Sequence, residues 1–246
     1  MSALTDYERT RYSRQILIDG WGTEGQSKLK SSSVFIAGAG GLGSPVSIYL
    51  AVAGVGEIRI CDADTVELSN LNRQILHTEA RLGEYKVLSA EKMLRELNPA
   101  VRIDPCSDFL DKNSVQRIVA RPDIVIDCLD NFETRYLLNA YCAKQGIPFV
   151  HGAVHGLLGQ VSFLHPPETP CLQCLFPDAP PKETFPIVGA TAGIVGSIQA
   201  MEALKFLSGI GSALKGQLLF IDGADVTYST IDIKRAPSCA ICGSRV

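Results

Sequence analysis

Residues 34–43 read VFIAGAGGLG, an apolar run that ends in closely spaced glycines. Gly38, Gly40 and Gly43 fit the pattern G-x-G-x-x-G between a predicted strand and a predicted helix. In that setting the first glycine allows a tight turn, the second lets the backbone approach a phosphate, and the third permits close packing of helix and strand. The free N–H groups at the start of the helix then face an anion. The motif predicts a nucleotide site, for which NAD would be the default ligand. The alternative interpretation is a glycine turn that serves only the packing of strand and helix.

Strands and helices are predicted to alternate on both sides of this loop. Strands are expected over residues 34–38, 57–64, 101–106 and 123–130, and helices over 44–54, 84–98, 110–120 and 131–146. This alternation predicts an α/β fold of Rossmann-like type, with a mostly parallel sheet and helices on both faces. Further strands over 147–154, 159–166, 217–222 and 227–233 predict a mixed or antiparallel continuation of the sheet. Ligands of such sheets bind beyond the carboxyl ends of the parallel strands.

Composition narrows the class of protein. The chain of 246 residues is 46% hydrophobic and 20% charged, which suits a conventional core. Its net charge of −3 lacks the basic excess that a nucleic-acid surface needs. The first residues, MSALTDYERTRYSRQ, do not resemble a secretory signal. Together with eight cysteines, these features predict a reducing, cytoplasmic location in which thiols bind metal or fill the core.

One uncharged segment, TFPIVGATAGIVGSIQAM at 184–201, has two interpretations. As a membrane helix it barely reaches the roughly 18–20 residues that a bilayer requires. It also contains Gln199, and Glu202 and Lys205 follow at helical spacing. We therefore expect a buried packing helix and no membrane contact.

Charged residues near the expected strand ends favour a triphosphate over a hydride carrier. Arg73 follows the second strand and Lys86 begins the next helix, so both could reach a polyphosphate and stabilise its charge. Asp130, at the tip of the fourth strand, offers hard oxygen ligands for Mg²⁺. Asp62, at the end of the second strand, is placed to bind ribose hydroxyls. Asp64 is expected to assist the metal or only to turn the chain. Each residue alone has an ordinary structural explanation, and it is their combination that indicates chemistry.

One further aspartate and two pairs of cysteines also stand out in the sequence. Asp127 lies inside an apolar run and is expected to orient backbone. Two C-x-x-C pairs, each preceded by a proline, predict a closed tetrahedral Zn²⁺ site of structural type, with a redox pair or two disulfides as alternatives; they are Cys171, Cys174, Cys239 and Cys242. The remaining cysteines are expected in the core, and the four histidines show no ligand spacing.

Taken in order, several motifs resemble the ThiF/MoeB/HesA family, the bacterial relatives of ubiquitin-activating enzymes. The similarity runs from about Arg11 to Gly243 and includes both C-x-x-C pairs. The other motifs are RYSRQI (11–16), GAGGLGS (38–44), AGVG (53–56), SNLNRQ (69–74), GEYK (83–86), DCLDN (127–131) and GSIQAMEALKFLSG (196–209). As a set they are far more specific than the glycine loop alone.

The resemblance implies a homodimeric adenylyltransferase. Such an enzyme would use ATP and Mg²⁺ to adenylate the C-terminal Gly-Gly carboxylate of a small ubiquitin-like sulfur carrier, and a sulfurtransferase or cysteine desulfurase would act downstream. Residues 1–30 would form a helical arm, 31–150 the nucleotide half, and 151–246 the carrier-binding and zinc half. Arg14 would reach the phosphates from the opposite subunit, and Asp130 would hold magnesium. The nucleotide would contact Gly38, Gly40, Gly41, Gly43, Asp62, Asp64, Asn70, Arg73, Gln74 and Lys86.

The chain departs from the family pattern at one point. Several members carry a cysteine, able to join covalently to the carrier, in the loop before the uncharged helix, but no cysteine lies between Cys174 and Cys239 here. We therefore expect adenylation without a covalent link by that route, in the thiamin pathway slightly ahead of the molybdopterin pathway. A zinc-stapled dimeric binding module without catalysis is the first alternative, and a nicotinamide oxidoreductase the second.

Overall fold

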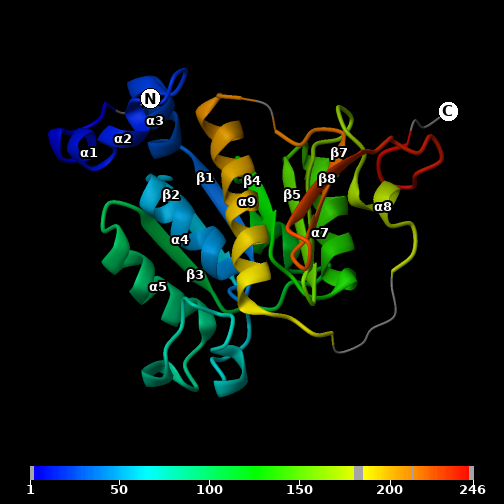
Figure 1. Ribbon diagram of the computed structural model, residues 1–246, viewed down its shortest axis with the longest axis horizontal. Coiled ribbons are helices and arrows are strands. Elements are labelled where there is room, and N and C mark those ends of the chain that lie inside the picture. The colour runs from blue at the N-terminus through cyan, green and yellow to red at the C-terminus, as the bar shows by residue number, and fades with distance from the viewer. Residues whose placement is uncertain (1–2, 180–184, 212, 244–246) are drawn as a thin grey trace.

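A single eight-stranded sheet forms the centre of the computed structural model, which describes residues 3–179, 185–211 and 213–243 (Figure 1). The strands are β1 (Ser33–Ala37), β2 (Glu57–Cys61), β3 (Arg102–Cys106), β4 (Ile124–Asp127), β5 (Phe149–His155), β6 (Leu158–Leu164), β7 (Gln217–Asp222) and β8 (Thr227–Asp232). Their order is β3-β2-β1-β4-β5-β6-β7-β8. Strands β1 to β5 pair in parallel, and β5 to β8 pair antiparallel. The predicted parallel sheet with an antiparallel continuation is confirmed.

Helices cover both faces of this sheet, as predicted. The apolar residues of α3 (Gly22–Lys30), α4 (Gly43–Ala53), α5 (Lys86–Leu97) and α9 (Gly189–Ser208) pack into one core cluster on the first face. Those of α6 (Val115–Val119), α7 (Phe132–Gln145) and α8 (Leu172–Leu175) pack into a second cluster on the other. Two 3₁₀ turns, at Leu68–Asn70 and Glu79–Arg81, lie in the long connection between β2 and α5. Because both faces are buried, β1 and β4 consist almost entirely of apolar side chains.

The uncharged segment is the packing helix that the sequence predicts, although the expectation began at Thr184, outside the described residues. Helices α4 and α9 run side by side in front of the sheet in Figure 1. A Cβ atom on Gly196 would lie only 2.5 Å from Pro45 Cγ, so the missing side chain is what lets the two helices approach. Across the described part of the chain, no helix is long and apolar enough to cross a membrane.

Three predicted boundaries were wrong. The helix expected over 110–120 covers only Val115–Val119, because the Asp111 carboxylate accepts the N–H groups of Asn113 (2.7 Å) and Ser114 (2.8 Å) and holds a turn instead. Strand β4 ends at Asp127, so Asp130 lies in the loop beyond the strand and not at its tip. Strand β2 likewise ends at Cys61, which leaves Asp62 and Asp64 in the following loop. Part of the expected proline-rich loop, residues 180–184, lies outside the described residues.

The first helices form an arm at the end of the sheet where the parallel strands begin. It comprises α1 (Asp6–Arg11), α2 (Ser13–Ile16) and α3. Buried Tyr12 accepts a hydrogen bond from Asn98 Nδ2 at 2.8 Å. Gln26 donates to the carbonyl of Ala53, the last residue of α4, at 2.9 Å. The arm therefore packs at the opposite end of α4 from the glycine loop.

Candidate functional site

The glycine loop follows β1 at the point where the sheet order reverses, with β2 on one side of β1 and β4 on the other. Gly38 has φ +104°, and a Cβ atom there would lie 2.6 Å from the carbonyl oxygen of Cys128. A Cβ atom on Gly43 would lie 2.0 Å from the carbonyl oxygen of Gly38. Gly40 meets only the side chain of Gln74, whose Nε2 would lie 3.4 Å away. The first and third glycines are thus required by the fold, whereas the second leaves backbone open to a ligand.

Two side chains brace this loop. Asp62 Oδ2 accepts the N–H of Ala39 at 2.8 Å. On the other side His77, which is buried, lies with Nε2 2.9 Å from the Ala39 carbonyl and Nδ1 2.9 Å from Ser89 Oγ. Burial holds the pKa of His77 below its ordinary value, so the ring is a neutral brace. This bracing role of His77 was not predicted from the sequence, because its partners lie far away in the chain and follow no spacing rule.

The predicted cations lie beside the loop and are already held by protein groups. Lys86 Nζ is 2.9 Å from Asp64 Oδ2; the lysine side chain is 8% exposed and the aspartate 70%. Arg73 donates from Nη1 to the Ser69 carbonyl and to Asn72 Oδ1, each at 2.9 Å. A Cβ atom on Gly41 would lie 3.6 Å from Arg73 Cγ, which places the arginine stem against the glycine loop.

Two predicted site residues, Gln74 and Asp130, have polar atoms without a partner in the described part of the chain, which leaves these atoms available to a ligand. Gln74, next to Gly40, is buried, and its Oε1 has no hydrogen-bond partner among the described residues. Asn70 is buried in the same connection, where its Oδ1 accepts the Glu67 N–H at 3.3 Å. Asp130 is exposed in the loop after Cys128, and its carboxylate makes no hydrogen bond or ion pair within the part of the chain that the structure describes. A free carboxylate here fits the oxygen preference of Mg²⁺.

Arg14 is the predicted site residue that this chain does not bring to the loop. It lies on α2, within the N-terminal arm, and its side chain is exposed. Helix α4, whose far end contacts the arm, has 11 residues and is therefore about 16 Å long. A role for Arg14 at the glycine loop would have to come from another copy of the chain.

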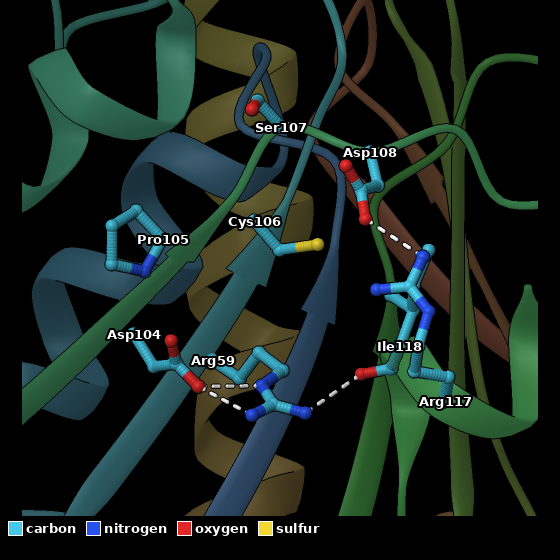
Figure 2. Close-up of a pocket in the computed structure, with 8 residues that line it drawn as sticks. All are labelled: Arg59, Asp104, Pro105, Cys106, Ser107, Asp108, Arg117 and Ile118. Carbon is cyan, nitrogen blue, oxygen red and sulfur yellow. Dashed lines mark hydrogen bonds and ion pairs between the residues drawn. The ribbon is translucent and has the colours of Figure 1, made fainter.

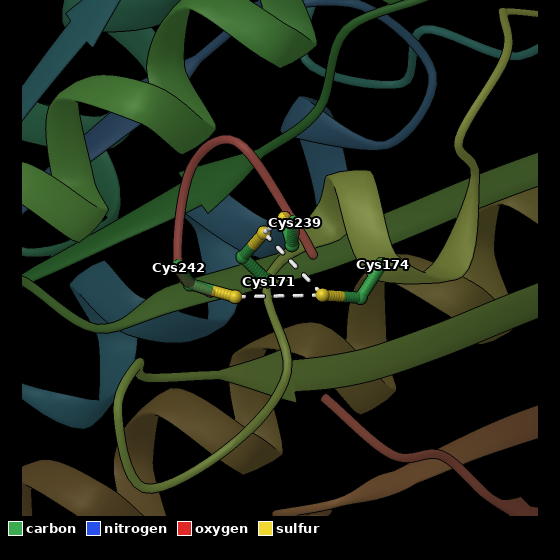
Figure 3. A group of neighbouring side chains, drawn as sticks. All are labelled: Cys171, Cys174, Cys239 and Cys242. Carbon is green, nitrogen blue, oxygen red and sulfur yellow. Dashed lines mark hydrogen bonds between the residues drawn. The ribbon is translucent and has the colours of Figure 1, made fainter. Parts of the chain in front are cut away.

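The four paired cysteines meet at one point (Figure 3). Cys171 is the N-cap of the short helix α8 and Cys174 lies within it, while Cys239 and Cys242 come from the last described loop. Three sulfur pairs are 3.4–3.9 Å apart, and all four sulfurs lie within 4.8 Å of one another. Tetrahedral Zn–S bonds of 2.3 Å place sulfurs about 3.8 Å apart, so the arrangement could hold a metal ion.

A separate pocket of about 360 Å³ opens beside the carboxyl end of β3 (Figure 2). Its charged walls are paired: Arg59 with Asp104, and Arg117 with Asp108 at 2.8 Å. Cys106, expected in the core, is partly exposed and lines this pocket. None of the predicted nucleotide residues lines it.

A buried polar cluster beneath the loop after β4 was also not foreseen in full. Asp127 Oδ2 lies 2.7 Å from His151 Nδ1 and 3.2 Å from Arg135 Nε, and neither Asp127 nor His151 is exposed. Burial would raise the pKa of the Asp127 carboxyl, but Arg135 and His151 together hold it below its usual value. Burial also lowers the pKa of His151, so its Nδ1–H donates from a neutral ring.

Comparison with known proteins places this geometry in a family. The sequence profile of the ThiF family matches residues 12–241, nearly the whole chain. The chain belongs to the ThiF family. This confirms the resemblance carried by its motifs.

Named relatives extend the comparison. The chain is 47% identical to the "SAMP-activating enzyme E1" of Haloferax volcanii, over 95% of this chain and 88% of that protein. It is 42% identical to the "Sulfur carrier protein adenylyltransferase" of Thermus thermophilus, over 97% and 92%. It is also 42% identical to the "Adenylyltransferase and sulfurtransferase MOCS3" of Sus scrofa, where it spans 99% of this chain but 55% of that longer protein. A crystal structure of E. coli MccB with ATP shares the ThiF-family fold, with a TM-score of 0.88 and 24% identity over 97% of this chain and 75% of that one.

The glycine roles lead to a paired test. Gly43→Ala should lower the free energy of unfolding by about 1–3 kcal/mol, because its methyl group would overlap a backbone carbonyl. Gly40→Ala should stay within about 0.5 kcal/mol of the wild type and yet weaken binding of a fluorescent ATP analogue. Urea unfolding and fluorescence titration measure the two effects. Equal loss of stability in both variants would contradict the division of roles.

Neutral buried histidines predict acid sensitivity. The folded-state pKa values of His77 and His151 are lowered, so below about pH 6.5 the unfolded chain takes up protons that the folded chain does not. Stability should therefore fall as the pH drops from 7 to 5, by up to about 1.4 kcal/mol per pH unit for each histidine. Urea midpoints across this range should show a shallower slope for His77→Gln. An unchanged slope in His77→Gln would contradict the role of its buried ring in this acid sensitivity.

Proposed function

We propose that this chain is an adenylyltransferase that uses ATP to activate the C-terminal Gly-Gly carboxylate of a small ubiquitin-like sulfur carrier. The observation that supports the proposal is the glycine loop, where the Gly40 backbone is open and the Arg73 stem lies against Gly41, with Lys86 paired to Asp64 in the connection after β2. Asp130, which has no partner in the described part of the chain, lies in the loop after β4, where the carbonyl of Cys128 approaches Gly38. A relative named a sulfur carrier protein adenylyltransferase, at 42% identity, and one named a SAMP-activating enzyme E1, at 47%, support the choice of reaction.

The chemistry needs positioning and charge more than a protein nucleophile. The carrier carboxylate attacks the α-phosphorus, the bond from that phosphorus to the oxygen bridging to the β-phosphorus breaks, and pyrophosphate leaves with the electron pair. Lys86 would exchange Asp64 for a phosphate oxygen, and Arg73 would turn from Ser69 toward the triphosphate. Asp62 would bind the ribose while it holds the loop at Ala39. Asp130 would hold Mg²⁺, which neutralises charge on the phosphates when bound.

A homodimer is part of the proposal. An apolar groove of about 620 Å³ is lined by residues of α4, α9 and β8, among them Tyr49, Ile194 and Tyr228. Exposed Ile75 and Met201 extend the apolar surface around it, at 60% and 56% exposure. A second copy of the chain covering this face would bury it, and would be the source of an Arg14 that its own subunit cannot use.

The remaining assignments follow the same proposal. Residues 1–30 act as the arm, 31–150 as the nucleotide half and 151–246 as the carrier and zinc half. Zn²⁺ would occupy the four cysteines as a closed structural ion, since no fifth ligand position is left for catalysis. The absence of a cysteine between Cys174 and Cys239 favours release of a free acyl-adenylate to a separate sulfurtransferase or cysteine desulfurase, in the cytoplasm.

The reaction is tested by ATP–pyrophosphate exchange against a panel of carriers ending in Gly-Gly, including those of thiamin and molybdopterin synthesis. Exchange should require one of these carriers, and Asp130→Ala should lower it about a hundredfold or more without shifting the unfolding midpoint. The carrier that supports exchange identifies the pathway. Carrier binding that is indifferent to ATP and to Asp130→Ala would instead favour a non-catalytic binding module.

Sharing of the site between subunits is tested by complementation. Arg14→Ala and Asp130→Ala homodimers should each be inactive. A mixed dimer carries one complete site, with Asp130 from the first variant and Arg14 from the second, so equal mixing after subunit exchange should restore about a quarter of wild-type activity. No recovery in mixtures shown to contain mixed dimers would contradict donation of Arg14 across the interface.

A further inference from the structure

The loop that carries Asp130 rests on an ion pair with almost no access to solvent. The Asp127 side chain is 0% exposed and that of Arg135 is 6% exposed. His151 adds a third member to what we call the Asp127 cluster, defined as Asp127, Arg135 and His151. Such a pair is costly to bury unless every donor and acceptor is used, so its contacts indicate what it is for.

Asp127 and Arg135 of this cluster hydrogen-bond to the backbone of Leu129, the residue that precedes Asp130. Asp127 Oδ1 accepts the N–H of Leu129 at 3.1 Å, and Arg135 Nη2 donates to the carbonyl of Leu129. Both backbone groups of Leu129 are therefore fixed by buried side chains. On the other side of Asp130, Asn131 caps α7 by accepting the N–H of Thr134 at 2.9 Å. The exposed carboxylate thus lies between two immobilised neighbours.

The cluster is itself held by contacts with α9, with the β5 backbone and with the residue that follows α8. Gln199 of α9 donates to the Asp127 carbonyl at 2.7 Å, and Arg135 donates to the Gly152 carbonyl of β5 at 3.0 Å. Phe176, next to α8, packs on the His151 ring with centroids 5.7 Å apart. Side chains that only filled the core would not need directed hydrogen bonds to both backbone groups of Leu129.

We propose that the Asp127 cluster is a positioning device for the metal-binding carboxylate of Asp130. The inference rests on the proposed function, because it takes Asp130 as the Mg²⁺ ligand. Fixing Leu129 and Asn131 removes the loop freedom that metal binding would otherwise have to restrict, so the carboxylate is aimed before the metal arrives. Asp127, Arg135 and His151 are positioning residues and do not touch the nucleotide.

The test measures metal affinity directly. Mn²⁺ is titrated into the protein with a non-hydrolysable ATP analogue, and free Mn²⁺ is followed by electron paramagnetic resonance. Asp127→Asn should weaken Mn²⁺ binding about tenfold or more, as for other groups that orient metal ligands. Arg135→Lys, which keeps the charge but cannot span the Asp127 carboxylate and two carbonyls, should weaken it in the same direction. It decides the matter if Asp127→Asn does not fold.

Asp104→Asn is the matched control, because Asp104 also pairs with an arginine in the same sheet but faces the pocket beside β3. It should leave Mn²⁺ affinity unchanged, and because the Arg59–Asp104 pair is partly exposed it should cost less stability than Asp127→Asn. In the exchange assay, Asp127→Asn should raise the Mg²⁺ concentration for half-maximal rate without changing the KM for the carrier, and excess Mg²⁺ should recover the rate.

Two outcomes separate this inference from the proposed function. Wild-type Mn²⁺ affinity in both Asp127→Asn and Arg135→Lys, with binding lost in Asp130→Asn, overturns the positioning role alone. Wild-type affinity in Asp130→Asn overturns the metal assignment of the proposed function, and the positioning role with it.

Discussion

The structure depends on close contacts between backbone segments at two glycines, where any side chain would overlap a carbonyl oxygen. The end of β1 turns so tightly into α4 that Gly43 lies against the Gly38 carbonyl, while Gly38 itself lies against the carbonyl of Cys128 after β4. These two approaches bring the loops after β1 and β4 together at the reversal of strand order. Asp62, which accepts the N–H of Ala39, and the loop that carries Asp130 therefore lie at the same edge of the sheet.

The two cations beside the glycine loop both have protein partners in this structure. Lys86 is almost fully buried and leans on Asp64, which is mostly exposed, so the lysine keeps a counter-ion while the aspartate is free to move into water. Arg73 is held only by a carbonyl and an amide oxygen, which are weaker partners than a phosphate. The resting contacts therefore prevent an uncompensated buried charge without competing strongly against a polyanion.

Much of the fold was predictable from the sequence, and the predictions that failed did so for physical reasons. The alternation of apolar strands with helices ending at residues such as Gly146 was enough for the sheet and its two helical layers. The positions of Asp62 and Asp130 at the edge where the parallel strands end were predictable, although both strands end earlier than expected. His77 and the partners of Asp127 were not, since their hydrogen bonds join distant elements and leave no periodic trace. The false start of the helix at 110 arose because the side chain of Asp111 competes for backbone N–H groups.

The cysteine group has a consequence for energetics at a distance. Cys171 is the N-cap of α8 and Cys174 lies within it, and the residue after the helix, Phe176, accepts a hydrogen bond from Tyr136 at 2.8 Å and packs on His151. Stabilising α8 therefore also stabilises the support of the Asp130 loop. If a metal ion bound by the four sulfurs raised the affinity of a ligand at Asp130, then by thermodynamic linkage that ligand would raise the affinity of the metal ion by the same factor. The two ends of this half of the molecule would be coupled equilibria, although they share no atom.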